Sequence, residues 1–178
     1  SIDNQEGGRL ATQHLIEQGH RRIGIITGGL ANYEARERLG GYHAAMKEAD
    51  LPQNDDWVAS GDFSRESGKD AVRRLLEVDP RPTAVFASND EMAMGAVHAL
   101  RDQGLSVPED VAIIGFDDLP SAKDFTPPLS TVNARMGDIG EEAVSMLMGL
   151  MQNSVDGQST QRVKQLDPLL RVRASSGH

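Results

Sequence analysis

The chain has 178 residues, of which 38% are hydrophobic and 25% charged, a composition typical of soluble globular proteins. Its 27 acidic and 18 basic residues give a net charge of -9, which argues against a broad phosphate-neutralising surface, so we expect that this segment does not itself bind DNA. The chain has no cysteine, and its five histidines show no metal-ligand spacing. We therefore expect no disulfide and no metal site.

Short apolar runs alternate with longer amphipathic stretches over the first two thirds of the chain. The expected helices are residues 5–18, 33–49, 64–78 and 90–103, and the expected strands are residues 23–26, 57–59, 84–87 and 111–114. Strands that are apolar throughout are typical of parallel sheets covered on both faces. The order of elements therefore predicts an α/β fold with a doubly wound, mostly parallel sheet.

The pattern changes after Pro127-Pro128. A short strand at 130–132 precedes an apolar helix at 138–151, a polar loop at 152–160 and an extended stretch at 163–173. This tail forms no complete strand-helix-strand unit of its own. It should complete either the edge of the same sheet or a second lobe.

Candidate ligand-binding residues follow the carboxyl ends of the expected strands, where loops and helix N-termini converge in such sheets. They lie in the segments Thr27–Gly29, Gly61–Phe63, Ser88–Asp90 and Gly115–Asp118. Asp117 and Asn89 can exchange hydrogen bonds with hydroxyl groups, and Phe63 can cover the apolar face of a sugar or a base. This chemistry suits a neutral, polyhydroxylated ligand.

Each of these candidates also has a structural interpretation. Ser88 or Asn89 would cap the following helix, Phe63 would be a core residue, and Asp117-Asp118 would be a solvated loop. Arg36 and Arg38 lie two residues apart on an expected helix, so they point roughly 200° away from each other. At most one of these two arginines can face the cleft.

The sequence carries no recognisable catalytic or cofactor motif. Gly28-Gly29 is not part of a dinucleotide-binding GxGxxG motif, and a GxxxxGK[ST] phosphate loop is absent. Ser64 lacks a GxSxG context, and no histidine follows a strand to serve as its base. We therefore expect a non-enzymatic protein without a cofactor, and an enzyme on a flavodoxin-like sheet is the weaker alternative.

Several segments together resemble the effector-binding domain of transcriptional regulators of the lactose/galactose-repressor (LacI/GalR) family. They are Asp3-Asn4, Gly7–Ala11, His14–Ile16, Gly19–Gly24, Arg38–Tyr42, Ala87–Gly95 and Val111–Asp118. Each segment is weak alone, but all occur in the family's order. The resemblance extends from Asp3 to about Arg173.

The resemblance implies two lobes like those of periplasmic sugar-binding proteins, with a small effector between them. Residues 1–132 would form the C-terminal lobe, residues 133–162 would return to the N-terminal lobe, and residues 163–178 would bring the last strand back. A headpiece that reads operator DNA and most of the N-terminal lobe are expected to be missing from this chain. The expected protein is a cytoplasmic, dimeric regulator that responds to a sugar or sugar derivative, and the alternative is a periplasmic sugar-binding protein of a transporter.

The resemblance also implies roles for single residues. Arg38 would bind effector hydroxyls or a carboxylate, Phe63 would stack on the effector, Asn89 would make a polar contact, and Asp117 would accept hydrogen bonds. Ala134 departs from the family pattern, which has a polar, ligand-facing residue there, so Asn133 or Arg135 would take that role.

Two further residues are expected at a dimer interface. On the helix at 90–103, one continuous apolar arc should pack on the sheet: Met92, Ala93, Ala96, Val97, Ala99 and Leu100. Met94 falls outside this arc and should be exposed, and it occupies a position that in the resembling family meets the two-fold mate. Phe125 occupies another such family position, although it could instead be a core residue under a loop.

Overall fold

A computed structural model describes residues 1–135, 137, 140, 144, 148 and 165–177 of the chain. Its helices are α1 (Asn4–Glu17), α2 (Tyr33–Glu48), α3 (Arg65–Glu77), α4 (Asp90–Asp102) and α5 (Pro120–Asp124), with 3-10 turns at Asp55–Trp57 and Ala174–Ser176. Its strands are β1 (Ile23–Thr27), β2 (Val58–Ser60), β3 (Ala84–Ala87), β4 (Ala112–Asp117), β5 (Ser130–Asn133) and β6 (Leu169–Arg171). In this described part, no helix is long and apolar enough to cross a membrane.

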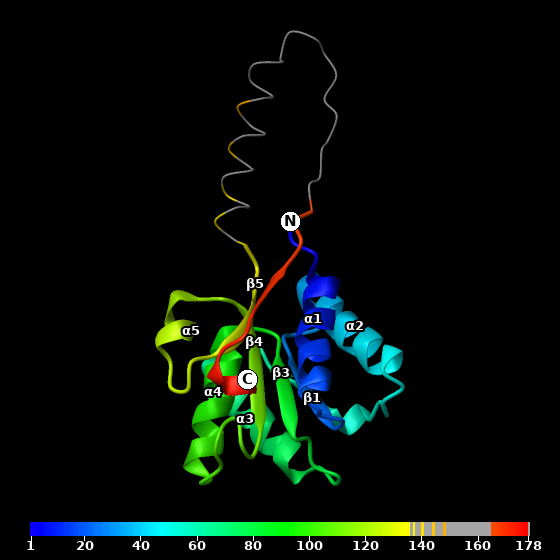
Figure 1. The fold of residues 1–178 in the computed structure, drawn as a ribbon, viewed down its shortest axis with the longest axis vertical. Helices are drawn as coiled ribbons and strands as arrows, with labels where there is room; N and C mark the ends of the chain where they lie inside the picture. The colour runs from blue at the N-terminus through cyan, green and yellow to red at the C-terminus, as the bar shows by residue number, and fades with distance from the viewer. Residues whose placement is uncertain (136, 138–139, 141–143, 145–147, 149–164, 178) are drawn as a thin grey trace.

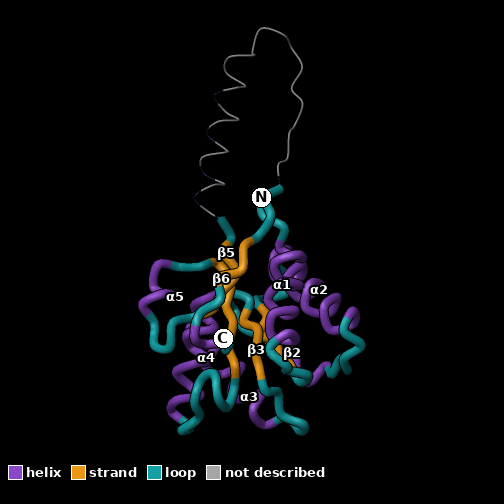
Figure 2. Tube along the Cα trace, viewed as in Figure 1, coloured by secondary structure: helices purple, strands orange, loops and turns teal. Residues whose placement is uncertain are grey.

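The strands form one sheet in the order β2-β1-β3-β4-β5-β6. The first five strands are parallel, and β6 runs antiparallel to β5. Figure 1 shows helices on both sides of this sheet, and Figure 2 separates the helices from the strands by colour. The doubly wound, mostly parallel sheet predicted from the sequence is confirmed.

Two apolar clusters cover the two faces of the sheet and account for the all-apolar strands. Ile23 and Ile25 of β1 pack with residues of α1 and α2, whereas Ile26 packs with α3 and α4. All five residues of β1 are buried. Burial on both faces explains why the strands read as continuous apolar runs rather than as alternating ones.

Close contacts between neighbouring helices depend on glycine. A Cβ atom added to Gly68 of α3 would overlap the backbone of Met92, and one added to Gly95 of α4 would overlap the backbone of Arg65. The two helices therefore pack at backbone distance. Their shared surface continues the apolar cluster on that face of the sheet.

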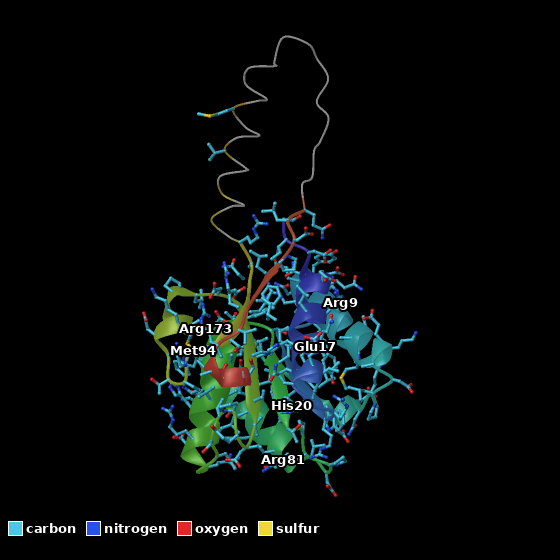
Figure 3. All side chains as sticks on the ribbon, in the orientation of Figure 1. Arg9, Glu17, His20, Arg81, Met94 and Arg173 are labelled. Carbon is cyan, nitrogen blue, oxygen red and sulfur yellow. The ribbon has the colours of Figure 1, made fainter. Side chains whose placement is uncertain are left out.

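The buried surface of α4 extends further than the sequence predicted. Met94 is 1% exposed and belongs to the apolar cluster, and Arg65 Nη2 lies 3.4 Å from its sulfur. Figure 3 labels this side chain. The expectation of an exposed Met94 is wrong, because α3 covers the side of α4 that the sheet leaves open.

The described helices begin and end close to the predicted positions. Side chains of Asp3, Asn32, Ser64 and Asn89 cap α1, α2, α3 and α4 by accepting a backbone N–H three residues on. Two short elements differ from prediction. The strand predicted at 57–59 is displaced by one residue because Trp57 ends a 3-10 turn, and the short helix α5 was not predicted.

The C-terminal segment completes the edge of the same sheet. Strand β6 pairs with β5, and Leu166 bridges to Ile2 near the N-terminus. The predicted helix at 138–151 and polar loop at 152–160 lie outside the described residues apart from single positions, as does most of the predicted returning segment 133–162.

Candidate functional site

The parallel strands place the predicted ligand-binding residues at one edge of the sheet. Arg38 Nη1 donates to the carbonyl oxygen of Ser88 at 2.6 Å and lies 3.8 Å from Asp117 Oδ1. Asn89 Nδ2 donates to the carbonyl oxygen of Phe63 at 2.9 Å. The contacts of Arg38 with Ser88 and Asp117, and of Asn89 with Phe63, thus place the four predicted residues at one edge of the sheet.

Arg38 is held rigidly beneath this edge. Its side chain is buried, its Nε donates to Asn4 Oδ1 at 2.8 Å, and its guanidinium carbon lies 3.7 Å from the centre of the Phe116 ring. Burial lowers the pKa of Arg38, whereas the carboxylates of Asp117, Glu34 and Asp90 oppose this effect. Two hydrogen bonds and the stacked ring hold the guanidinium in one orientation. A side chain that is preorganised in this way loses little entropy when a ligand binds.

The neighbouring arginine plays no such part. Arg36 is exposed and donates to the carbonyl oxygens of Leu30 and Ala31 in the loop before α2. Only Arg38 of the two faces the sheet edge, in agreement with the helical spacing.

Asp117 presents a partly exposed carboxylate at the end of β4. Its side chain is 30% exposed, and burial raises its pKa to about 6, while Arg38 lowers the pKa and Glu34 raises it. The backbone φ of Asp117 is 111°, a conformation that side chains rarely adopt. Because 3.8 Å from Arg38 exceeds hydrogen-bond length, the carboxylate keeps acceptor capacity toward a ligand.

Asn89 caps α4, as the structural interpretation of the sequence proposed. Its Oδ1 accepts from the backbone N–H of Met92 at 2.9 Å, and its Nδ2 bonds to Phe63, so both ends of the amide are engaged. An amide has a second N–H and a second lone pair. A ligand contact by Asn89 would have to use these.

Phe63 lies half-buried over the end of β1. A Cβ atom at Gly28 would overlap the Phe63 ring, so the glycine allows the ring to lie directly on the strand end. The φ of Phe63 is 70°. The ring also packs against the apolar cluster of α3 and α4, so it is partly core and partly surface.

Asp90 belongs to a predicted candidate segment, but it supports the site from below through contacts that the sequence did not reveal. It is fully buried, its Oδ1 accepts from Thr131 Oγ1 at 2.6 Å, and its Oδ2 accepts from the backbone N–H of Leu119 at 2.7 Å. Burial raises its pKa to about 7, although these two hydrogen bonds lower it. An acidic residue in the first turn of a helix is expected to face solvent near the helix N-terminus, and its partners 29 and 41 residues away leave no local signal.

Asn133 and Arg135 are proposed to make the polar ligand contact that Ala134 cannot make. Ala134 is buried and Asn133 is engaged, because its Nδ2 donates to Asp118 Oδ2 at 2.8 Å and its Oδ1 accepts from the backbone N–H of Arg135. Arg135 is half-buried with a φ of 50°. Which of Asn133 and Arg135 makes the ligand contact stays a prediction.

No group of three or more His, Cys, Asp or Glu residues in the described ranges is arranged to hold a metal ion. A surface cavity elsewhere lies beside the amino ends of β4 and β5, and Val97, Arg101, Val107 and Pro127 contribute to its lining. It is separate from the edge that carries Asp117.

The sequence matches the family described as periplasmic binding protein-like domain over residues 12–176. It is 45% identical over 148 residues to the HTH-type transcriptional repressor PurR of Actinobacillus pleuropneumoniae serotype 3, covering 83% of this chain and 44% of that protein. It is also 42% identical over 170 residues to PurR of Haemophilus influenzae, covering 96% and 51%. The chain thus spans about half the length of these relatives.

Solved structures agree with the sequence relatives. The fold matches a transcriptional regulator CelR–cellobiose complex with a TM-score of 0.89 at 40% identity, over 98% of this chain and 52% of that one. It matches a sugar-binding LacI-family regulator from Escherichia coli, complexed with phosphate, with a TM-score of 0.87 at 34% identity, over 98% and 61%. The chain therefore belongs to the periplasmic binding protein-like family, as an effector-binding domain of the LacI/GalR type.

Proposed function

We propose that this chain is the effector-binding part of a bacterial transcriptional repressor, and that a sugar or sugar derivative binds at the carboxyl edge of its sheet. The main support is the cluster of Arg38, Asp117, Asn89 and Phe63, which presents an acceptor, an amide and an aromatic face around one fixed guanidinium. The relatives named as repressors favour regulation over transport. A periplasmic sugar-binding protein shares the fold and is the alternative.

The charges at this edge favour a neutral effector over a phosphorylated one. Arg38 lies 3.8 Å from Asp117 and 3.7 Å from Glu34, so two carboxylates offset its charge. Its Nε and Nη1 donors already serve Asn4 and Ser88. A phosphate group would bring further negative charge beside Asp117 and Glu34, whereas sugar hydroxyls can donate to Asp117.

We further propose that the full-length protein has a second lobe over this edge, a headpiece that binds operator DNA, and a two-fold dimeric, cytoplasmic form. On this proposal residues 1–132 belong to one lobe, residues 133–162 reach the other lobe, and residues 163–178 return. Effector binding would change how the two lobes of each protomer are oriented, and thereby how the headpieces of a dimer are spaced on a symmetric operator.

A thermal-shift screen of the full-length protein tests the proposed effector class. The panel should contain neutral mono- and disaccharides, including cellobiose, together with the matching sugar phosphates and purine bases. A neutral sugar should raise the melting temperature most, because binding to the folded state alone stabilises it. A larger shift with sugar phosphates or purines would contradict the proposed effector class.

A further inference from the structure

We propose that Asp118 is a positioning residue that couples the ligand-facing Asp117 to strands β5 and β6, which flank in the sequence the segment proposed to reach the second lobe. The inference rests on the proposed function, since it assigns a route from the effector to the rest of the protein. Asp118 itself need not touch the effector.

Consecutive carboxylates at the end of β4 point to different partners. Asp117 has a φ of 111° and Asp118 a φ of 57°, so the backbone turns sharply between them. Asp117 lies beside Arg38, whereas Asp118 Oδ1 lies 2.7 Å from Arg173 Nη2 and Asp118 Oδ2 accepts from Asn133. Only 13% of the Asp118 side chain is exposed, which places this ion pair largely out of water.

This one carboxylate binds both β5 and the segment that follows β6. Asn133 is the last residue of β5, and Arg173 follows β6 by two residues. Arg173 Nη1 also donates to the carbonyl oxygen of Leu129, and its backbone N–H donates to Ser130 Oγ. Figure 3 labels Arg173 at the C-terminal part of the chain. Asp118 therefore links the turn after β4 to β5 and to the segment after β6.

The same turn has a second anchor on α4. The backbone N–H of Asp118 donates to Thr131 Oγ1 at 3.3 Å, Thr131 donates to Asp90, and Asp90 accepts from the backbone N–H of Leu119. The segment 117–119 is thus fastened to α4 on one side and to β5 on the other. A displacement of Asp117 must move these bonds or strain them.

The strands that Asp118 holds flank, in the sequence, the residues that we propose reach the second lobe. Asn133 pairs with both Asp117 and Leu169, and Ile2 bridges to Leu166 close by. Figure 1 shows β5 and the C-terminal strand side by side beneath the N-terminus. A ligand that repositions Asp117 would therefore alter the direction of these strands through Asp118 and Arg173. Such a link appears as a coupling free energy between effector and operator binding.

The test compares D118N with wild type in the full-length protein. Cellobiose is the probe, or, where it gives no thermal shift, the neutral sugar with the largest shift in the screen. Sugar affinity is measured by calorimetry, and the operator dissociation constant is measured with and without saturating sugar on a DNA fragment selected with wild-type protein. We expect D118N to keep its sugar affinity within about threefold, while the sugar-dependent change in operator affinity falls from roughly tenfold toward none.

E91Q is the matched control. Glu91 forms an ion pair with Arg65 at 2.9 Å, and this pair joins α3 to α4 instead of involving β5 or β6. E91Q should keep the wild-type coupling. R173K retains the positive charge but loses the bond geometry, and it provides a second variant if D118N does not fold. R173K should also reduce the coupling without weakening sugar binding.

Each outcome separates this inference from the proposed function. Wild-type coupling in both D118N and R173K overturns the inference alone. A large loss of sugar affinity in D118N also overturns it, because Asp118 would then be a ligand contact. If wild type shows no sugar-dependent change with any sugar of the panel, the proposed function itself fails.

Discussion

Arg38 connects three parts of the lobe through one buried side chain. It donates to Asn4 at the start of α1 and to Ser88 after β3, and it lies beside Asp117 at the end of β4. Arg38→Met would leave these buried acceptors without a donor and Asp117 without its counter-charge. We expect a loss of about 2–4 kcal/mol in the free energy of unfolding, measured by urea denaturation.

Arg36→Met provides the control for this substitution. Arg36 is exposed on the same helix, so its replacement should change the free energy of unfolding by less than about 0.5 kcal/mol. Equal effects of the two substitutions would show that the buried hydrogen bonds of Arg38 do not contribute to the free energy of unfolding.

The raised pKa of Asp117 predicts a defined pH dependence of stability. Its pKa is about 6 in the folded protein, above its ordinary value of 3.8, so the folded state holds the proton more tightly than the unfolded chain does. This stabilising contribution is complete below about pH 4 and is lost as the pH rises through 6. Asp117→Asn cannot titrate, so the stability of this variant relative to wild type should rise between pH 4 and 6 and then level off.

The measurement is urea denaturation of both proteins at several pH values. Asp90, whose pKa is about 7, titrates in both proteins, and because Asp117 contributes to raising that pKa, the difference between them reports Asp117 together with a smaller change in Asp90. Asp124→Asn on the exposed surface of α5 should follow wild type throughout. A constant difference from pH 4 to 6 would contradict the raised pKa.

At the residue scale, the sequence predicted the members of the site better than their individual bonds. Strand ends were sufficient to place Asp117 and Asn89 at one edge, whereas helix spacing left open which of Arg36 and Arg38 faces it, and the family resemblance singled out Arg38. The pairing of Asp118 with Arg173 joins residues 55 positions apart. Such a bond depends on strand order, which no local pattern encodes.

At the scale of elements, the sequence pattern of α4 predicted only one of its two buried faces. Its sequence has an apolar arc for the sheet, but a second partner, α3, covers the neighbouring side and buries Met94. Periodicity gives the direction of one apolar face and not the number of neighbours. The short helix α5 was missed because five residues hold too few apolar positions to show a period.

Close packing of α3 on α4 predicts opposite effects for two glycine substitutions. Gly68→Ala should lower the free energy of unfolding by about 1–3 kcal/mol, because its methyl group would meet the backbone of Met92. Gly40→Ala, in α2 with open space around it, should raise it by about 0.5–1 kcal/mol through helix propensity. Urea denaturation measures both, and a neutral Gly68→Ala would mean that the helices can move apart freely.

At the scale of the whole molecule, the proposed dimer face now rests on Phe125. Met94 is buried in this chain, so Met94→Glu would place a charge in the core and report on folding instead of assembly. Phe125 is half-buried, packs against the α4 cluster and lies 5.3 Å from the ring of His98, measured between ring centres. It therefore combines the core role and the surface role considered for it.

Phe125→Glu should convert the proposed dimer of the full-length protein to a monomer in light scattering. In a two-fold symmetric interface both protomers carry the substitution, so two glutamates enter the same contact. Leu30→Glu, at the exposed rim near the start of α2, is the control and should leave the mass unchanged. A dimer mass for a folded Phe125→Glu variant would remove this face as the interface.

Calorimetric titration of the full-length protein with its effector, for wild type and Asp117→Ala, tests the proposed site most directly. The sugar is the one that gives the largest thermal shift in the screen, and Asp124→Ala serves as the surface control. The partly exposed Asp117 carboxylate is proposed to accept hydrogen bonds from sugar hydroxyls, so Asp117→Ala should weaken binding at least about tenfold while operator binding without effector is retained. Unchanged sugar affinity in a folded Asp117→Ala protein would contradict the placement of the effector at this edge of the sheet.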